Sequence, residues 1–301
     1  MTNWTRREVL AAGAALGFAP ALGHTADAML TKPIPSSGEQ LPVVGLGTYS
    51  VFDVDSTADE IAARKTILER LTGAGGSVID TSPMYNRSEG VIGDVIDAGI
   101  ERDKLFLATK VWTDGRAAGL KQMQRSAELM STKVIDLMQV HNLRDTAVHM
   151  ASIREWQEDG RIRYSGLTHY TASAQAALAR EMQEFEPQFI QINYSLGERE
   201  AEERVLPMAA DLGIAVIINR PFQAGRLFRT VSGKTLPNWA MEFAESWGQF
   251  FLKFIISHPA VTCVIPATSK PHHMIDNLGA GRGPLPDAAT RKRMAEFFKT
   301  V

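Results

Sequence analysis

Three successive hydrophobic runs end in polar side chains at nearly constant spacing. The runs end at Asp80, Lys110 and His141, which lie 30 and 31 residues apart. This spacing is about that of one strand–helix unit of a (β/α)₈ barrel. The carboxyl ends of barrel strands surround one pocket, so we expect these side chains to meet there. Tyr85, shortly after the first run, is expected to join them.

The whole chain alternates between strand-like and helix-like patterns. Parallel strands buried on both faces read as continuous apolar runs, and amphipathic helices place apolar residues on one face. Helical patterns cover 58–71 and 200–212, among others, and 30–41 is expected to be a hairpin plugging one barrel end. We therefore predict one (β/α)₈ TIM-barrel domain. Its strands are expected to begin near Val43, Ser77, Leu105, Val134, Tyr164, Phe189, Ala215 and Thr262.

An open doubly wound α/β sheet is the alternative architecture. Such sheets normally begin with a glycine-rich phosphate loop that has three glycines before its helix. The segment 43–48 contains only Gly45 and Gly47 in a partial Gly-x-Gly pattern. The barrel is therefore the better prediction.

The first 28 residues differ from the rest of the chain. Arg6 and Arg7 precede a weakly apolar stretch at 11–22, and 26–28 reads Ala-Asp-Ala. This pattern predicts a twin-arginine export signal at 1–28, a periplasmic mature domain at 29–301, and the export machinery as a partner. The stretch is too short for a membrane span. A leader on a cytoplasmic protein is the alternative.

Charge and cysteine content exclude some classes of partner and structure. The net charge is −2, which gives no support for binding to nucleic acid or an anionic membrane. Cys263 is the only cysteine, so no disulfide can form within the chain. Neither feature specifies an oligomeric state.

The residue types at the strand ends suit proton transfer to a carbonyl. A free phenol has a pKa near 10 and is a poor acid at neutral pH, but a nearby ammonium lowers that pKa. Lys110 can act on Tyr85 in this way, and Asp80 can pair with Lys110. His141 can donate a hydrogen bond to the reacting oxygen. Together they supply what a carbonyl reduction needs.

This constellation resembles the aldo-keto reductase family over residues 41–277. The resemblance implies a barrel that binds NAD(P)H without a Rossmann fold and transfers hydride to an aldehyde or ketone. It implies Tyr85 as the acid, Lys110 and Asp80 as its tuners, and His141 as the substrate orienter. The matching motifs are Gly45-Leu46-Gly47-Thr48, Asp80-Thr81-Ser82 with Tyr85, Ser88-Glu89 with Ile92-Gly93, Ala108-Thr109-Lys110-Val111-Trp112, and Gln139-Val140-His141.

Later strand ends resemble the family's nicotinamide site, with departures. Thr168 and His169 occupy a segment that is typically Ser-Asn and holds the carboxamide, and Gln191 matches the carboxamide-binding glutamine. Asn219 stands where an aromatic ring usually stacks on nicotinamide. Arg220 is a candidate for the cofactor diphosphate, with a surface or helix-capping role as its alternative.

The last strand and the helix after it resemble the adenosine-phosphate segment. Candidates for the 2′-phosphate are Thr268, Lys270 and His273, and Asp276 and Asn277 fit the adenine-binding pair. A lysine is a point-charge phosphate ligand without the fork of arginine. The resemblance implies NADP(H) in preference to NAD(H). Thr48, in the first motif, joins the cofactor-binding set.

The substrate is expected to be a small carbonyl compound. Tyr49, Trp112 and Asn142 follow strand ends and are expected to line the pocket. A second hypothesis is a slow NADP(H)-binding, redox-sensing or regulatory subunit on the same barrel. A third is a metal-dependent barrel hydrolase, which requires His-x-His or clustered carboxylates. His272 and His273 lack a carboxylate partner in sequence, so no metal site is predicted.

Overall fold

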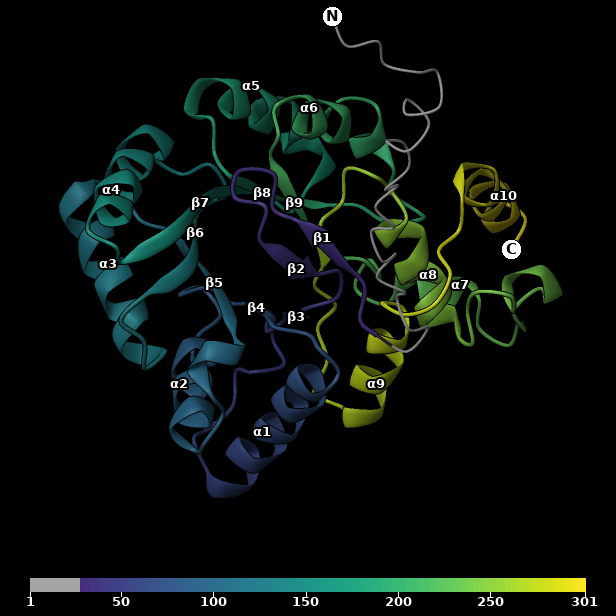
Figure 1. Cartoon of the computed structure of the whole chain (residues 1–301), viewed down its shortest axis with the longest axis horizontal. Helices are drawn as coiled ribbons and strands as arrows, with labels where there is room; N and C mark the ends of the chain where they lie inside the picture. The colour runs from purple at the N-terminus through teal and green to yellow at the C-terminus, as the bar shows by residue number, and fades with distance from the viewer. Residues whose placement is uncertain (1–27) are drawn as a thin grey trace, which may run out of the picture.

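The computed structural model describes residues 28–301, so all but the last residue of the expected export signal lies outside the described part. Eight parallel strands form one sheet in sequential order at the centre of the molecule (Figure 1). The strands are β3 (Leu46–Gly47), β4 (Val78–Asp80), β5 (Phe106–Val111), β6 (Ile135–His141), β7 (Ile162–Thr168), β8 (Phe189–Asn193), β9 (Ala215–Asn219) and β10 (Cys263–Val264).

Backbone hydrogen bonds join the first barrel strand to the last. The amide of Gly45 donates to Val264 O at 2.9 Å, and the amide of Val264 donates to Val43 O at 2.9 Å. A parallel bridge between Gly47 and Ala267 extends this contact. The sheet is therefore closed, and the predicted (β/α)₈ barrel is confirmed.

Helices surround the barrel (Figure 1). None of the helices within 28–301 combines the length and apolar character needed to cross a membrane. The α-helices are α1 (Ala58–Gly73), α2 (Ser88–Asp97), α3 (Arg116–Leu129), α4 (Thr146–Glu158), α5 (Gln175–Phe185), α6 (Val205–Asp211), α7 (Arg226–Thr230), α8 (Trp247–Ile256), α9 (Pro271–Gly279) and α10 (Ala288–Phe298). Short 3₁₀ turns are η1 (Arg102–Lys104), η2 (Ala172–Ala174), η3 (Glu200–Glu202) and η4 (Asn238–Ala240).

The helix expected at 200–212 is divided into η3 and α6. Pro207 explains the division, because proline has no N–H and its ring clashes with the carbonyl four residues earlier in a continuous helix. With α6 beginning at Val205, the proline falls in the first turn, where its missing N–H loses no intrahelical bond.

The barrel interior is apolar at one end and polar at the other. An inner cluster of buried side chains includes Phe106, Tyr164 and Phe189, whose rings lie 5.4–6.0 Å apart. Strand side chains alternate between faces, so residues two and four positions further along the same strands also point inward. Those positions bring polar groups to the carboxyl ends of the strands.

A hairpin closes the opposite end of the barrel, as predicted. It consists of β1 (Thr31–Pro33) and β2 (Gln40–Pro42), which pair antiparallel. Ile34 and Leu41 are buried in the inner cluster. Lys32 anchors the hairpin to the end of α8, where its ammonium donates to the carbonyls of Ile256, His258 and Val261 at 2.6–2.9 Å.

We expect Lys32→Met to destabilise the fold by about 2–4 kcal/mol, because three carbonyls lose a charged donor. Urea unfolding measures the change. Lys292→Met, at an exposed position in α10, is the matched control and should change stability by less than about 0.5 kcal/mol. Equal stabilities of the two variants would contradict the anchoring role.

Candidate active site

Asp80 and Lys110 form a buried ion pair at the polar end of the barrel. Lys110 Nζ lies 2.7 Å from Asp80 Oδ2 and 2.6 Å from Thr81 O. Burial alone would lower the pKa of Lys110, but attraction to Asp80 and Tyr85 outweighs it and the pKa is raised. Lys110 is therefore an ammonium at neutral pH.

The other oxygen of Asp80 accepts two side-chain amides. Gln191 Nε2 lies 2.7 Å from Asp80 Oδ1, and Gln139 Nε2 lies 3.1 Å from it. Thr48 donates its amide and hydroxyl to Asp80 O, both at 3.0 Å. Sequence reasoning did not assign Gln139 a role. Its position two residues before His141 on β6 puts both on the inner face, which is the signal that could have identified it.

Tyr85 lies on the loop between β4 and α2, with its ring facing the ion pair. Lys110 Nζ is 5.0 Å from the ring centroid, and the His141 ring lies 6.2 Å away at 85°. Tyr49 packs edge-on at 5.1 Å. Burial raises the pKa of Tyr85 although the Lys110 ammonium opposes it. The effect of Lys110 has the expected direction, but burial is the larger effect, and the phenol holds its proton at neutral pH.

His141 is a neutral hydrogen-bond donor at the end of β6. Burial, with smaller effects of Lys110 and His169, lowers its pKa to about 3. Ser82 Oγ lies 3.1 Å from Nδ1 and accepts the Met84 amide at 3.2 Å. When the serine hydroxyl donates to Nδ1, the imidazole proton lies on Nε2, and this is the tautomer that can donate to a substrate oxygen. In the sequence Ser82 stands out only as part of the Asp80-Thr81-Ser82 motif, and its contact with His141 becomes visible only in the fold.

The low pKa of His141 predicts acid sensitivity. Between pH 6.5 and about 3, His141 is protonated in the unfolded chain but neutral in the folded protein. The free energy of unfolding therefore falls as the pH falls through this window. The slope is at most about 1.4 kcal/mol per pH unit for one residue. Urea unfolding at several pH values should show a shallower slope for His141→Gln than for wild type.

Two other histidines provide the comparison. Burial also lowers the pKa of His258, to about 4, so this residue adds to the slope in every variant. His272→Gln, at an exposed position, should retain the wild-type slope. If the unfolding free energy of His141→Gln had the same slope against pH as that of wild type, the neutral form of His141 would not be a source of the acid sensitivity.

The residues expected to hold nicotinamide lie together on β7, β8 and β9. Thr168 Oγ1 and Asn219 Nδ2 each lie 3.3 Å from Gln191 Oε1, and Asn219 Nδ2 is 3.2 Å from His169 O. Arg220 is exposed, with its guanidinium 5.8 Å from the Tyr170 ring centroid. These contacts connect the expected cofactor side to Asp80 through Gln191.

The expected adenosine contacts lie around the start of α9. The Lys270 amide donates to Thr268 Oγ1 at 3.1 Å. Among the described residues, neither Lys270 nor His273 forms an ion pair. Asp276 accepts Ser246 Oγ at 2.8 Å, and Asn277 is buried. The Lys270 ammonium and the His273 ring are thus open to a phosphate, whereas the carboxylate of Asp276 already has a partner.

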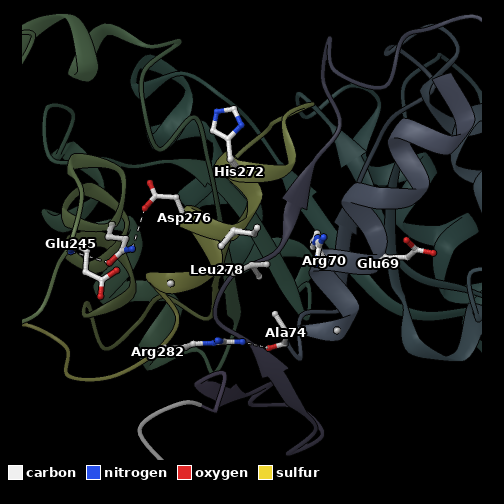
Figure 2. A pocket seen from close by; sticks show the side chains of 12 residues that line it. Glu69, Arg70, Ala74, Glu245, His272, Asp276, Leu278 and Arg282 are labelled. Carbon is white, nitrogen blue, oxygen red and sulfur yellow. Dashed lines mark hydrogen bonds between the residues drawn. The ribbon is translucent and has the colours of Figure 1, made fainter. Parts of the chain in front are cut away.

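Asp276 also lines a charged groove of about 630 Å³ between α1, α9 and the start of α8. Figure 2 shows Asp276 and Glu245 on one wall and Arg282 reaching toward Ala74 O, at 3.4 Å, at the end of α1. None of the four expected catalytic residues lines it. The groove is therefore separate from the cluster at the strand ends.

The expected pocket residues lie on loops after β3, β5 and β6. Tyr49 is 66% exposed. Trp112 is half-buried beneath the Arg144 guanidinium, which lies 4.7 Å from its ring centroid. Asn142 has φ +57°, and its buried Oδ1 has no hydrogen-bond partner among residues 28–301. All three follow strand carboxyl ends, where the catalytic cluster lies.

Residues 28–301 contain no group of three or more His, Cys, Asp or Glu side chains arranged to hold a metal ion.

Comparison with known proteins gives a consistent set of relatives. A family model described as Aldo/keto reductase family matches residues 43–293. Glyoxal reductase of Bacillus subtilis (strain 168) is 25% identical over 249 residues, covering 80% of this chain and 83% of that protein. Aldo-keto reductase YhdN of the same organism is 31% identical over 206 residues, covering 62% of this chain and 60% of the relative.

Solved structures share the fold. The crystal structure of an aldo/keto reductase from Klebsiella pneumoniae in complex with NADP and acetate has a TM-score of 0.74 and 24% identity. The likeness covers 87% of this chain and 93% of that one.

Proposed function

Because this chain belongs to the aldo/keto reductase family, we propose that it is an NADP(H)-dependent reductase of small aldehydes and ketones with Tyr85 as its general acid. One observation carries the proposal. The Tyr85 phenol and the His141 imidazole stand beside the buried Lys110–Asp80 pair at the carboxyl ends of the strands. A proton donor (Tyr85), an orienting donor (His141) and a fixed positive charge (Lys110) thus lie next to one another at the barrel opening.

The residues present fit the cofactor. Two buried oxygens at the strand ends, Asn142 Oδ1 and Asn219 Oδ1, have no hydrogen-bond partner in the described part of the chain. Exposed cations at Arg220 and Lys270 suit a diphosphate and a 2′-phosphate. The solved relatives from Klebsiella pneumoniae were crystallised with NADP and NADPH. When bound, the reduced nicotinamide supplies the hydride that the carbonyl carbon accepts.

The side chains of this protein divide the remaining chemistry. His141 Nε2–H donates to the carbonyl oxygen and fixes its direction. Tyr85 gives its proton to the same oxygen as negative charge develops there. The Lys110 ammonium stabilises the phenolate that remains, and Asp80 holds that ammonium in place.

A turnover assay tests this function. The purified protein is mixed with NADPH and a panel of small aldehydes, ketones and quinones, and loss of nicotinamide absorbance is followed. We expect turnover of several small carbonyls and tighter binding of NADPH than of NADH. Binding without consumption would favour the redox-sensing hypothesis, and tighter NADH binding would contradict the NADP(H) preference.

We further propose that the mature domain is exported to the periplasm by the twin-arginine route. Arg6 and Arg7 ahead of a short apolar stretch support this. Fractionation should find the processed chain in the periplasm, and replacing both arginines by lysine should retain the full-length chain in the cytosol. Full-length protein found only in the cytosol for the native sequence would contradict the proposal.

A further inference from the structure

We infer that Asp53 is a positioning residue for Tyr85. Its carboxylate lies on the loop between β3 and α1 and fixes the turn that directly follows Tyr85, which keeps the phenol beside Lys110. The inference rests on the proposed function, in which Tyr85 is the general acid. It adds to that function a carboxylate that lies outside the four residues at the strand ends and acts through the backbone of the neighbouring loop.

The loop that carries Asp53 is anchored to the body of the barrel. Phe52 is fully buried, and its amide donates to Thr48 O at 3.1 Å. Arg64, on α1, donates from Nε to Val51 O at 2.7 Å, and its guanidinium carbon lies 5.8 Å from the centroid of the Phe52 ring. The backbone just before Asp53 is therefore held by both the core and a helix, so Asp53 can serve as a fixed point for a neighbouring loop.

Asp53 uses both carboxylate oxygens to hold the two residues after Tyr85. Oδ2 accepts a hydrogen bond from Asn86 Nδ2 at 2.7 Å, and Oδ1 accepts from Arg87 Nε at 3.1 Å and from the Arg87 amide at 3.4 Å. The hydrogen bonds from Asn86 and Arg87 lower the pKa of Asp53, so it is a carboxylate at neutral pH. The contact to Asn86 is the shortest of the three, and Asn86 is the residue at which the backbone turns.

Asn86 has a backbone conformation that benefits from such support. Its φ is +50°, in the left-handed region, which costs energy for any residue with a β-carbon, although asparagine tolerates it better than most. The bond from Asn86 Nδ2 to Asp53 stabilises this conformation. The turn connects Tyr85 to the start of α2 at Ser88, whose amide donates to Tyr85 O at 3.0 Å. The direction in which the chain leaves Tyr85 is therefore set in part by Asp53.

The position of Tyr85 matters because proton transfer requires close contact. Its ring centroid lies 5.1 Å from that of Tyr49 and 5.0 Å from Lys110 Nζ. A displacement of about 1 Å at a reacting group can lower a rate by about 100-fold. The side chains of Asp53 and Arg87 are 25% and 55% exposed, and ion pairs at such positions contribute little to the free energy of unfolding. Loss of Asp53 should therefore slow the chemical step much more than it destabilises the fold.

Asp53→Ala tests the inference, with Asp55→Ala as its matched control. Asp55 lies on the same loop and pairs with the same Arg87 guanidinium, but its side chain is 78% exposed, and Asn86 Nδ2 bonds to Asp53 instead. Single-turnover kinetics with NADPH and a reactive aldehyde measure the chemical step. Asp53→Ala should lower its rate by about tenfold and leave the dissociation constant of NADPH within about twofold of wild type. Asp55→Ala should leave both values within about twofold of wild type.

The same substitution in Tyr85→Phe separates positioning from a general structural effect. If Asp53 acts through the Tyr85 hydroxyl, Asp53→Ala should slow Tyr85→Phe by less than about twofold. Asn86→Ala, with Tyr85 in place, should reproduce the loss seen in Asp53→Ala, and combining the two substitutions should lower the rate no further. Urea unfolding of each variant identifies the conditions under which all of them are folded, and the rates are compared there.

The possible failures are distinguishable. A rate for Asp53→Ala within about twofold of wild type, or an equal loss in the Tyr85→Phe background, overturns the positioning role and leaves the reductase proposal standing. A Tyr85→Phe protein as fast as wild type overturns Tyr85 as the general acid, and with it the role of Asp53. Wild type that consumes NADPH with none of the aldehydes overturns both the proposed function and the inference.

Discussion

Tyr85→Phe should lower kcat for carbonyl reduction by at least about 100-fold, the usual scale for a positioned general acid. Phenylalanine keeps the ring that packs against Tyr49 and faces His141, and it removes only the hydroxyl. Burial raises the pKa of Tyr85, so the hydroxyl carries its proton at neutral pH and has one to donate, while the Lys110 ammonium acts in the opposite direction and favours its release. Single-turnover kinetics with NADPH and a reactive aldehyde measure the chemical step directly.

A matched variant controls for loss of a buried phenol. Tyr164 lies at the apolar end of the barrel, where its hydroxyl bonds to Ser37 and Glu39. Tyr164→Phe should lower stability slightly, since the hydrogen bonds of this hydroxyl to Ser37 and Glu39 contribute roughly 1 kcal/mol. Because Tyr164 lies away from the catalytic cluster, kcat should stay within about twofold of wild type. NADPH affinity should be unchanged in Tyr85→Phe. A Tyr85→Phe enzyme as fast as wild type would remove this residue from the mechanism.

The catalytic cluster was predictable because strand ends in a barrel converge. Asp80, Lys110 and His141 end successive buried runs, and parallel register alone places them around one opening. Tyr85 follows Asp80 closely on the loop after β4, so this short connection keeps it at the same end of the barrel. The barrel itself was predictable for the same reason, since continuous apolar runs alternated with amphipathic segments.

Other features depend on atomic contacts that spacing does not encode. Gln139 and Ser82 support Asp80 and His141 through side-chain directions fixed only after the strands pair. The pKa of Tyr85 depends on the balance of burial against the Lys110 charge, which sequence cannot weigh. The 200–212 segment is divided because Pro207 interrupts a helix that the apolar spacing alone would continue.

Lys110→Met should abolish most activity and destabilise the protein by about 3–5 kcal/mol, because it leaves the Asp80 carboxylate buried without a counter-charge. The rate should fall by at least about 100-fold, since the phenolate left after proton transfer loses its stabilising ammonium. Lys110 also lowers the pKa of Tyr85, so any remaining activity should persist to higher pH. Urea unfolding and a pH–rate profile measure these effects.

Adding Asp80→Asn to Lys110→Met separates the structural role of the pair from its catalytic role. The double variant removes both charges, and the amide that replaces the carboxylate keeps an oxygen that can accept from Gln139 and Gln191. Neutral replacement of a buried ion pair generally restores stability, so we expect unfolding free energy within about 2 kcal/mol of wild type. Activity should stay as low as in Lys110→Met, because no ammonium faces Tyr85. Recovery of both stability and activity would show that the pair only supports the fold.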